Sequence, residues 1–361
     1  MSKVLVGLSG GVDSAVCAYL LKEKGYDVVG VTLRTWLDSS SEVSKCCELD
    51  DAAEIAKTLN IPYYIHNVGS LFCTYVTTPF VSDYLHGQTP NPCVVCNRQV
   101  KWEGMIYLTH VHNADYVATG HYAHIVKLPN GRYSVKQSAG TKDQAYMLYR
   151  LTQEQLSKTI MPLGDMSKDE VRQIAAKAGI PVANKPDSQE ICFVEDNGYA
   201  RYVEENAAKY GLSDLLKGEG NFVDENGNIL GRHKGIYHYT IGQRKGLGIA
   251  FGHPIFVKEI RPETNEVVLS EEDAIFNREI LVSDLNFMSI EGIKEGEEIP
   301  AKVKIRYRHG GEEAILTKYD DNTLKITFDN PVRASTAGQS AVFYDEDSCV
   351  IGGGRITGIL N

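Results

Sequence analysis

The segment Ser9-Gly10-Gly11-Val12-Asp13-Ser14 follows a short apolar run and opens a stretch with an apolar helical face. Two adjacent glycines allow the backbone to approach an anion, and the start of a helix offers free N–H groups and the positive end of its dipole. Ser9 and Ser14 add hydroxyl groups, and Asp13 could hold Mg²⁺ against phosphate oxygens. The Gly-Lys-Ser/Thr ending of a Walker A loop does not follow. The segment therefore indicates a nucleotide-phosphate site of another kind, and a glycine-rich turn without a ligand is the alternative.

Two segments that contain cysteine are the second candidate for chemistry. One holds the pair Cys93 and Cys96, and the other, Asp187-Ser188-Gln189-Glu190-Ile191-Cys192-Phe193, holds Cys192. A CxxC pair alone fits a redox motif, half of a zinc site or chance. Structural zinc is disfavoured, because no second His or Cys pair stands at the usual spacing from the first. The chain has 8 cysteines and no recognisable export signal, so we expect a cytoplasmic protein whose cysteines do thiol chemistry rather than form a disulfide scaffold.

Alternating strands and helices in the first half of the chain must position these residues. We expect strands at residues 4–8, 28–33, 62–66 and 115–119, and helices at 14–24, 51–59 and 153–178. In the last helical region, Ser167 and Glu170 form a capping box and Gly179 is the matching stop. Strands connected by helices predict an α/β fold with a parallel, doubly wound sheet.

The second half of the chain has a different sequence pattern. Beyond about residue 205, helical periodicity gives way to short β-rich runs separated by Gly, Asn and Pro. The runs from about residue 276 onward predict the strands of a small barrel or sandwich. We therefore expect a catalytic α/β domain at 1–205, a small mixed, β-rich domain at 206–275 and a C-terminal β-barrel-like domain at 276–361.

Composition and charge restrict the class of protein. The chain has 361 residues, 43% of them hydrophobic and 23% charged, so it can bury a sizeable core and is not disordered, fibrous or collagen-like. No apolar run approaches the roughly 20 residues that cross a bilayer, so we expect no membrane partner. The net charge of −10 argues against non-specific binding of nucleic acid, which depends on neutralising phosphates.

Two local stretches are basic although the net charge of the chain is negative. One spans Arg232 to Lys245, and in the other Lys302, Lys304, Arg306 and Arg308 alternate, which predicts that these four side chains share one face of a strand. A solvated strand face is one interpretation. The other is a surface that grips RNA phosphates, with aromatic side chains such as Tyr307 available for stacking.

The glycine-rich segment resembles the loop of the PP-loop ATP-pyrophosphatase superfamily, whose members cleave ATP between the α and β phosphates and adenylate a carbonyl oxygen. Further motifs make the resemblance closer. They are PNPCVVCN at 90–97, TGHYA at 119–123, Lys142-Asp143-Gln144, DSQEICF at 187–193 and GQSAVFY at 338–344. In this order, over essentially the whole chain, they resemble the tRNA-specific 2-thiouridylase family. Argininosuccinate synthetase, GMP synthetase and lysidine synthase share only the first motif.

The resemblance implies ATP-dependent 2-thiolation of the wobble uridine (position 34) of tRNA. The oxygen on carbon 2 would be adenylated with loss of pyrophosphate, and sulfur from a persulfide would then displace AMP. By motif, Cys192 would carry the persulfide. Cys96 would be its partner nucleophile, which releases hydrosulfide or closes a disulfide with Cys192. Thiolate is needed in either role, so both cysteines are expected in an electropositive, partly exposed pocket.

The resemblance also implies binding residues and partners. The expected contacts of ATP, with Mg²⁺, are Gly7, Leu8, Ser9, Gly10, Gly11, Val12, Asp13, Ser14, Leu33 and Gly120. Those of the target base are Asn91, Pro92 and Cys93, and those of the rest of the tRNA are His121, Lys142, Asp143, Gln144, Arg306, Tyr307 and Gln339. The implied partners are tRNAs of the glutamate, glutamine and lysine types and a sulfurtransferase or cysteine desulfurase that donates the persulfide.

Cys93 departs from the family pattern, in which many members carry an Asp proposed as a general acid–base group. A thiol with an ordinary pKa near 8.5 is a poorer proton shuttle than a tuned carboxylate. One hypothesis is that Cys93 takes the place of that Asp. The other is that Cys93, Cys96 and Cys192 ligate a [4Fe-4S] cluster whose open iron binds hydrosulfide.

Two other functions fit part of the sequence. A small-molecule ligase that forms AMP would use the glycine-rich loop but would give the two cysteine motifs no role. A non-catalytic RNA-binding protein would leave both the intact loop and the cysteines unexplained.

Overall fold

A parallel five-stranded sheet forms the N-terminal part of the chain. The computed structural model describes residues 1–35, 49–140, 142–183, 185, 191–194, 198–249 and 251–360. The strands are β1 (Lys3–Gly7), β2 (Asp27–Arg34), β3 (Tyr63–Asn67), β4 (Tyr116–Ala118) and β7 (Thr159–Ile160), in the spatial order β3-β2-β1-β4-β7. Every neighbouring pair is parallel. The predicted doubly wound sheet is confirmed.

Helices cover both faces of this sheet, which explains why the strands read as nearly continuous apolar runs. On β1, Val4 and Val6 share a buried cluster with α1 (Val12–Glu23), α2 (Leu49–Thr58) and α8 (Lys168–Lys177). Leu5, between them, points to the other face and joins the cluster that contains α6 (Glu103–His112). The carboxyl ends of the strands are therefore flanked by helix on both sides.

The helical region expected at 153–178 is wrong as a single element. It divides into α7 (Gln153–Ser157), the short strand β7 and α8, because Pro162 and Gly164 interrupt any helix between them. The start of α8 is as predicted. The Ser167 hydroxyl accepts from the backbone N–H of Glu170, and the Glu170 carboxylate accepts from that of Ser167.

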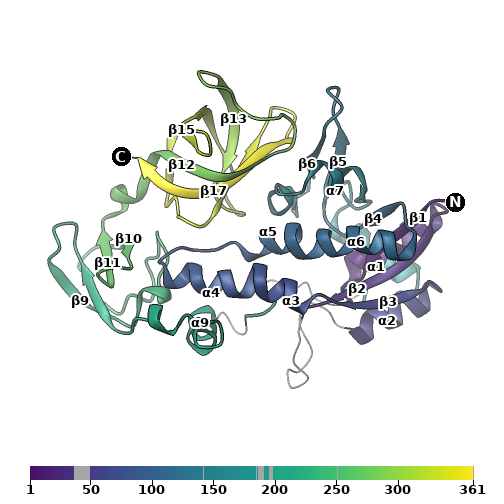
Figure 1. The fold of residues 1–361 in the computed structure, drawn as a ribbon, viewed down its shortest axis with the longest axis horizontal. Helices are drawn as coiled ribbons and strands as arrows, with labels where there is room; N and C mark the ends of the chain where they lie inside the picture. Colours follow the sequence, from purple (N-terminus) through teal and green to yellow (C-terminus); the bar gives the residue numbers. More distant parts are fainter. Residues whose placement is uncertain are drawn as a thin grey trace.

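Two helical stretches in the middle of the molecule separate the sheet from the C-terminal half (Figure 1). The first consists of α3 (Gly69–Phe72), η1 (Cys73–Thr77) and α4 (Thr78–Leu85). The second consists of α5 (Pro92–Cys96), η2 (Asn97–Trp102) and α6. Between α6 and α8 follow the hairpin β5 (Ala123–Lys127) and β6 (Tyr133–Gln137) and the turn η3 (Ala145–Leu148), and α9 (Tyr199–Ala207) packs against α4.

The middle of the chain forms a small four-stranded sheet with its own core. Its strands are β8 (Gly220–Val223), β9 (Ile229–His233), β10 (Phe256–Arg261) and β11 (Glu266–Ser270), in the order β10-β11-β8-β9. The short turns η4 (Ser213–Leu215), η5 (Ile236–His238) and η6 (Glu272–Ile275) connect it to its neighbours. Phe222, Val257 and Val267 are fully buried in its core.

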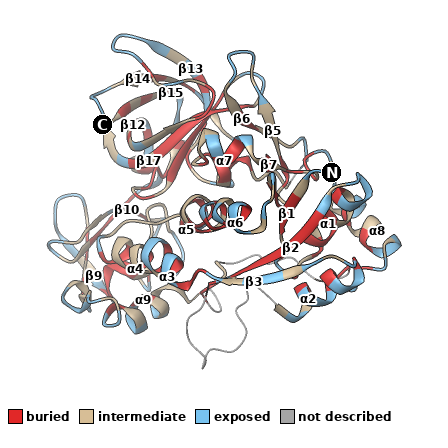
Figure 2. Ribbon diagram, turned by 45° about the vertical axis from the view of Figure 1, so that its right-hand side comes forward, coloured by how far each residue is buried: buried red, intermediate tan, exposed pale blue. Residues whose placement is uncertain are grey.

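The C-terminal part is a closed antiparallel barrel of order β12-β15-β14-β13-β16-β17. Its strands are β12 (Phe276–Phe287), β13 (Glu298–Lys304), β14 (Glu312–Lys318), β15 (Leu324–Arg333), β16 (Ser340–Tyr344) and β17 (Val350–Leu360). Figure 2 shows buried residues running along the barrel strands and along β1 and β2. In the part of the chain that the structure describes, no helix is both long and apolar enough to cross a bilayer.

The alternation of basic residues in the barrel does not form one face of a strand, so that expectation is wrong. Strand β13 ends at Lys304, so only Lys302 and Lys304 lie on it, while Arg306 and Arg308 follow in a turn. The turn directs the Arg306 guanidinium back to the barrel, where Nη1 donates to the Arg333 carbonyl oxygen (2.9 Å).

Candidate active site

The glycine-rich loop lies between the end of β1 and the start of α1, as predicted. Gly10 has φ +73°, a backbone conformation that favours glycine. A Cβ on Gly11 would meet only the Ser9 hydroxyl oxygen, at 3.4 Å, so the backbone there is open to a ligand. Ser14 holds the loop closed, since its hydroxyl donates to the Gly11 carbonyl oxygen (3.0 Å) and accepts from the Ser9 N–H (3.2 Å). The loop thus has the open backbone and the helix N-terminus that a polyphosphate needs.

Gly120, at the end of β4, packs directly on this loop. A Cβ at position 120 would lie 2.6 Å from the Asp13 carbonyl carbon and 2.8 Å from the Ser14 nitrogen. Only glycine lets the TGHYA segment approach the first turn of α1 so closely. Of the other predicted ATP contacts, Leu8 and Val12 bury their side chains in the core, so only their backbone can face a ligand.

Two lysines that the sequence did not indicate reach the loop. Lys168, the first residue of α8, places Nζ 2.7 Å and 2.8 Å from the two carboxylate oxygens of Asp13. The Tyr122 hydroxyl donates to the same carboxylate (2.7 Å). Lys185 donates to the Asp51 carboxylate (2.6 Å) and to the Gly10 carbonyl oxygen (3.5 Å), and burial lowers its pKa. Asp13 is therefore held by protein donors, and two ammonium groups lie beside the glycine-rich loop.

Leu33 lies near the carboxyl end of β2, which pairs with β1. A Cβ on Gly104 of α6 would lie 3.5 Å from the Leu33 side chain, so α6 closes over this edge of the sheet. In open α/β sheets ligands bind outside the carboxyl ends of the strands. The position of Leu33 is compatible with the predicted contact to a nucleotide at this edge.

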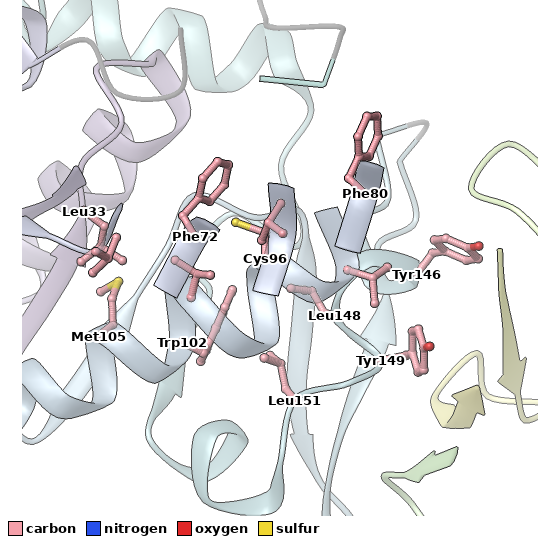
Figure 3. Close-up of a cluster of buried hydrophobic side chains, with 14 of the residues drawn as sticks. Leu33, Phe72, Phe80, Cys96, Trp102, Met105, Tyr146, Leu148, Tyr149 and Leu151 are labelled. Carbon is pink, nitrogen blue, oxygen red and sulfur yellow. The ribbon is translucent and has the colours of Figure 1, made fainter. Parts of the chain in front are cut away.

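Cys96 and Cys192 belong to one hydrophobic cluster. Cys96, at the end of α5, is buried, and Figure 3 draws it with Phe72 and Phe80 of the neighbouring helices. Cys192 is half-buried and packs against the same cluster. Both cysteines therefore border one large apolar core, which also includes Leu5 of the sheet and Val342 of the barrel. The expectation that both thiols are partly exposed is wrong for Cys96, because α5 packs its end against apolar side chains.

Phe193 fixes the segment that carries Cys192. Its ring centroid lies 5.6 Å from that of Phe72, 5.0 Å from that of Phe80 and 5.2 Å from that of Tyr202. Edge-to-face and tilted aromatic contacts at these distances stabilise packing beyond the area they bury. The motif residues 187–190 before Cys192 lie outside the described residues.

The barrel holds the loop that precedes α5. Gln339 donates through Nε2 to the carbonyl oxygens of Thr89 (3.0 Å) and Pro90 (3.2 Å), and the Thr89 N–H donates to the Ala337 carbonyl oxygen (2.9 Å). Arg355 adds an ion pair to Asp83 at the end of α4 (2.8 Å). The loop with Asn91, Pro92 and Cys93 is therefore positioned by the C-terminal barrel.

Two of the predicted tRNA contacts, Asp143 and Tyr307, come from different halves of the chain and meet at one cleft. Tyr307 donates to the Asp143 carbonyl oxygen (3.1 Å), and the Asp143 carboxylate accepts from the N–H groups of Ser138 and Ala145. A cleft of about 810 Å³ opens beside this contact, between the β5–β6 hairpin and the barrel. Its lining includes Tyr307, three basic residues and three acidic ones, namely Lys136, Lys304, Arg308, Asp143, Glu346 and Asp347. Gln144 accepts from the Tyr122 N–H (3.0 Å), which ties this region to the loop of Gly120.

His121 is neutral. Its Nδ1 lies 2.8 Å from the Thr119 hydroxyl, and its ring packs beside Trp102 at 5.4 Å. Burial, and secondly the Lys101 charge, lower the pKa of His121 to about 3. A contact between His121 and RNA would therefore be a hydrogen bond from a neutral imidazole.

Comparison with known proteins decides the family. Family models match residues 2–196 (tRNA methyl transferase HUP domain), 212–271 (tRNA methyl transferase PRC-barrel domain) and 277–356 (aminomethyltransferase beta-barrel domain). The tRNA-specific 2-thiouridylase MnmA of Lachnoclostridium phytofermentans is 54% identical over 99% of this chain and 99% of that protein. Those of Clostridioides difficile and Acetivibrio thermocellus are 49% and 48% identical over 98% of this chain, and over 98% and 99% of their own lengths. The chain belongs to the tRNA-specific 2-thiouridylase family.

The iron–sulfur hypothesis does not fit the arrangement of the cysteines in this thiouridylase. Cys93 is exposed on the first turn of α5, whereas Cys96 is buried in the apolar cluster. Among the described residues, which include all three cysteines, no group of three or more His, Cys, Asp or Glu side chains is placed to hold a metal ion. A solved U34-tRNA thiolase, NcsA from Methanococcus maripaludis, has a [4Fe-4S] cluster, but it is only 19% identical over 59% of this chain and 68% of its own, with a TM-score of 0.35. This likeness is therefore no evidence for a cluster in this thiouridylase.

The sequence gives little indication that Lys168 and Lys185 belong to this thiouridylase site. Lys168 follows the N-cap Ser167, and the capping box fixes the direction in which α8 begins. Lys185 stands shortly before the DSQEICF motif. Neither position has a recognisable spacing to the loop. Lys168 reaches Asp13 because α8 packs against α1, and Lys185 reaches Gly10 from the segment that follows α8.

Proposed function

We propose that this protein is an ATP-dependent tRNA 2-thiouridylase that replaces oxygen 2 of the wobble uridine with sulfur. The observation that carries the proposal is the packing of the cysteine-bearing helix on the nucleotide edge of the sheet. The segment from α5 to α6 holds Cys96, and it places Trp102 beside His121 and Gly104 beside Leu33. This packing supports the proposal that the phosphate loop and the sulfur chemistry belong to one site.

The activation step uses the glycine-rich loop. The uridine oxygen attacks the α-phosphorus of ATP, the bond to the β-phosphate oxygen breaks, and pyrophosphate leaves with Mg²⁺. Backbone N–H groups of the loop and the ammonium groups of Lys168 and Lys185 would neutralise the phosphates, since positioned cations stabilise the charge that moves to the leaving group. Asp13, held by Lys168 and Tyr122, would orient Lys168 before ATP arrives.

The sulfur step uses the two cysteines. The terminal sulfur of a Cys192 persulfide attacks carbon 2, and AMP leaves with the original oxygen. The Cys96 thiolate then attacks Cys192 Sγ, the sulfur–sulfur bond breaks, and its electron pair stays on the sulfur now attached to carbon 2. The products are 2-thiouridine and a Cys96–Cys192 disulfide, which a cellular thiol reductant must reduce before the next turnover. Alternatively, Cys96 attacks first and releases hydrosulfide as the nucleophile, with the same disulfide as product.

The tRNA would bind across the cleft between the β5–β6 hairpin and the barrel. Three basic residues of its lining, Lys136, Lys304 and Arg308, would contact phosphates, and the carboxylates of Asp143, Glu346 and Asp347 in the same lining restrict where a phosphate can lie. We propose tRNAs of the glutamate, glutamine and lysine types as substrates and a cysteine desulfurase or sulfurtransferase as the persulfide donor.

A reconstitution tests the function. Purified protein is incubated with an unmodified glutamate tRNA transcript, ATP·Mg²⁺, a cysteine desulfurase, L-cysteine and a thiol reductant, and the digested nucleosides are analysed by mass spectrometry. We expect 2-thiouridine in equal amount to AMP and in strict dependence on ATP. A transcript with cytidine at position 34 is the matched control and should yield no 2-thiouridine.

The two failures of this reconstitution have different meanings. Release of pyrophosphate without 2-thiouridine would support the activation step and contradict the proposed sulfur donor. Absence of both products from folded protein would contradict the proposed function.

A further inference from the structure

Two histidine side chains that the proposed function does not use meet between the parallel sheet and α6. His66 lies on β3, the outermost strand of that sheet, and His112 is the last residue of α6. Their Nε2 atoms are 3.2 Å apart, and their ring planes are inclined by 80° to one another. Both residues are half-buried, so solvent still reaches them. The fold therefore directs two imidazole nitrogens to one point near the surface.

The surrounding structure holds both rings in place. Tyr64 and His66 alternate along β3 and therefore share one face of the strand. The centroid of the Tyr64 ring lies 4.5 Å from that of His112, so the tyrosine packs against the second histidine. The His112 carbonyl oxygen accepts from Lys3 Nζ (3.4 Å), and Asn113, with φ +50°, ends the helix directly after it. The pair is thus arranged by contacts within the protein itself.

The separation of the two nitrogens suits a tetrahedral metal ion. Zn²⁺ binds imidazole nitrogen at about 2.0–2.1 Å, and a tetrahedral angle then places two such nitrogens about 3.3 Å apart. The observed distance between the Nε2 atoms is 3.2 Å. A metal-free pair can share one hydrogen bond, from Nε2–H of one ring to Nε2 of the other. Zinc would take both Nε2 lone pairs, and each neutral ring would then carry its hydrogen on Nδ1.

We propose that His66 and His112 form a zinc site near the protein surface, in which water fills the remaining coordination positions. Two protein ligands are enough for an open site, and such a pair is compatible with the lack of any three-residue group placed to hold a metal among the described residues. Imidazole ligands suit Zn²⁺, whereas Mg²⁺ prefers oxygen. A bound zinc ion would connect β3 to the end of α6, the helix whose Gly104 packs beside Leu33.

The test is a zinc titration of the metal-free protein by calorimetry at pH 8, where an ordinary imidazole is neutral. The wild type is compared with His66→Gln, His112→Gln and the double variant. All of these proteins keep the same cysteines, so zinc held by thiols contributes equally to each titration. We expect the wild type to bind one zinc ion more than any of the variants. Each single variant should lower the affinity of this site by about tenfold or more, because the second donor is no longer intramolecular.

His110→Gln is the matched control. His110 is exposed on the same helix, so its replacement removes one imidazole and leaves the pair intact. This variant should keep the zinc stoichiometry of the wild type. Thermal unfolding is the second readout. Zinc at about ten times its Kd should raise the unfolding temperature of the wild type and of His110→Gln by about 2–4 °C more than that of the other variants. Mg²⁺ at the same concentration should produce no such difference.

Three results would overturn the proposal. The first is an equal zinc stoichiometry and affinity in the wild type and in both single variants, which would leave the pair as a hydrogen bond between two imidazoles. The second is a loss in only one of the two single variants, since the ion would then be held by other groups. The third is equal occupation of the site by Mg²⁺, which would contradict imidazole ligation. Circular dichroism of each metal-free variant separates these results from loss of structure. Neither ATP nor tRNA is present, so the outcome is independent of the proposed function.

Discussion

Lys168 Nζ contacts both carboxylate oxygens of Asp13, at 2.7 Å and 2.8 Å, and the lysine side chain is only 10% exposed. The pair joins the first turn of α1 to the first turn of α8. A carboxylate at a helix N-terminus is stabilised by the dipole, whereas an ammonium group there is not. Lys168 is therefore held at an unfavourable helix position by Asp13, and incoming phosphate oxygens would offer it a second anion.

We expect Lys168→Ala to lower kcat/KM for ATP in the AMP-forming step by about 10- to 100-fold. Loss of one charge-assisted hydrogen bond to phosphate has this size, and the variant also leaves the Asp13 carboxylate uncompensated near the pyrophosphate. The measurement is tRNA-dependent AMP release at varied ATP concentration. Lys177→Ala, at the exposed end of the same helix, is the matched control and should behave as wild type. An unchanged kcat/KM in Lys168→Ala would exclude Lys168 from phosphate binding.

Gly120→Ala should disrupt the same loop from the opposite side. The new methyl group would lie 2.6 Å from the Asp13 carbonyl carbon, and backbone atoms cannot yield as a flexible side chain can. We expect a loss of about 1–3 kcal/mol in the free energy of unfolding and much weaker ATP binding. Denaturant unfolding and nucleotide titration measure the two effects. In Gly292→Ala no heavy atom lies within 4 Å of the new Cβ, so this control should keep wild-type values. Tight ATP binding by Gly120→Ala would mean that the loop tolerates displacement.

The sequence alone predicted the elements that depend only on residues close together in the chain. The apolar runs of β1 and β2, the glycine-rich loop and the Ser167–Glu170 capping box all depend on neighbours in the chain, and each was confirmed. The Lys168–Asp13 contact spans 155 positions and depends on how α8 packs against α1, which no local pattern records. The basic alternation of the barrel was misleading because the pattern does not reveal that β13 ends at Lys304. Long-range packing also explains why Cys96 is buried, although a thiol needed for chemistry was expected to be accessible.

The two cysteines of the site should separate the two half-reactions. We expect Cys192→Ser and Cys96→Ser each to abolish 2-thiouridine formation, while pyrophosphate release in the first turnover and tRNA binding stay within about twofold of wild type, because pyrophosphate leaves in the activation step, before either thiol acts. Mass spectrometry after incubation with the desulfurase should find a persulfide on Cys192 in the wild-type protein and in Cys96→Ser. Cys73→Ser is the control, because Cys73 lies on η1, outside both cysteine motifs, and its Sγ contacts the Thr78 hydroxyl (3.7 Å). Thiolation by either site variant would refute its assigned role.

The neutral state of His121 predicts a pH dependence of stability. Its folded-state pKa of about 3 lies below the ordinary value of 6.5, so between these values the unfolded chain binds the proton and the folded chain does not. The contribution to stability is therefore complete above pH 6.5 and is lost progressively as the pH falls. We expect His121→Gln to reduce the loss of unfolding free energy between pH 7.5 and pH 5 by about 2 kcal/mol, measured by urea denaturation. His110→Gln, on the exposed side of α6, should keep the wild-type difference. An identical pH dependence in His121→Gln would show that His121 protonates readily in the folded protein.

The two arginines that follow β13 should differ in their effects on tRNA. Arg308 lines the cleft beside the hairpin, whereas Arg306 is half-buried and donates to the Arg333 carbonyl oxygen. We expect Arg308→Ala to weaken tRNA binding and to reduce the slope of log affinity against log salt by about one, as for the loss of one phosphate contact. Arg306→Ala should chiefly lower the melting temperature, because it leaves the Arg333 carbonyl oxygen without this donor. Lys318→Ala, whose exposed partner is Asp321, is a control for the change in net charge. If Arg308→Ala and the wild type have equal salt slopes, the cleft is not part of the tRNA-binding surface. If Arg306→Ala has a reduced slope and unchanged stability, the Arg306 guanidinium contacts RNA phosphate instead.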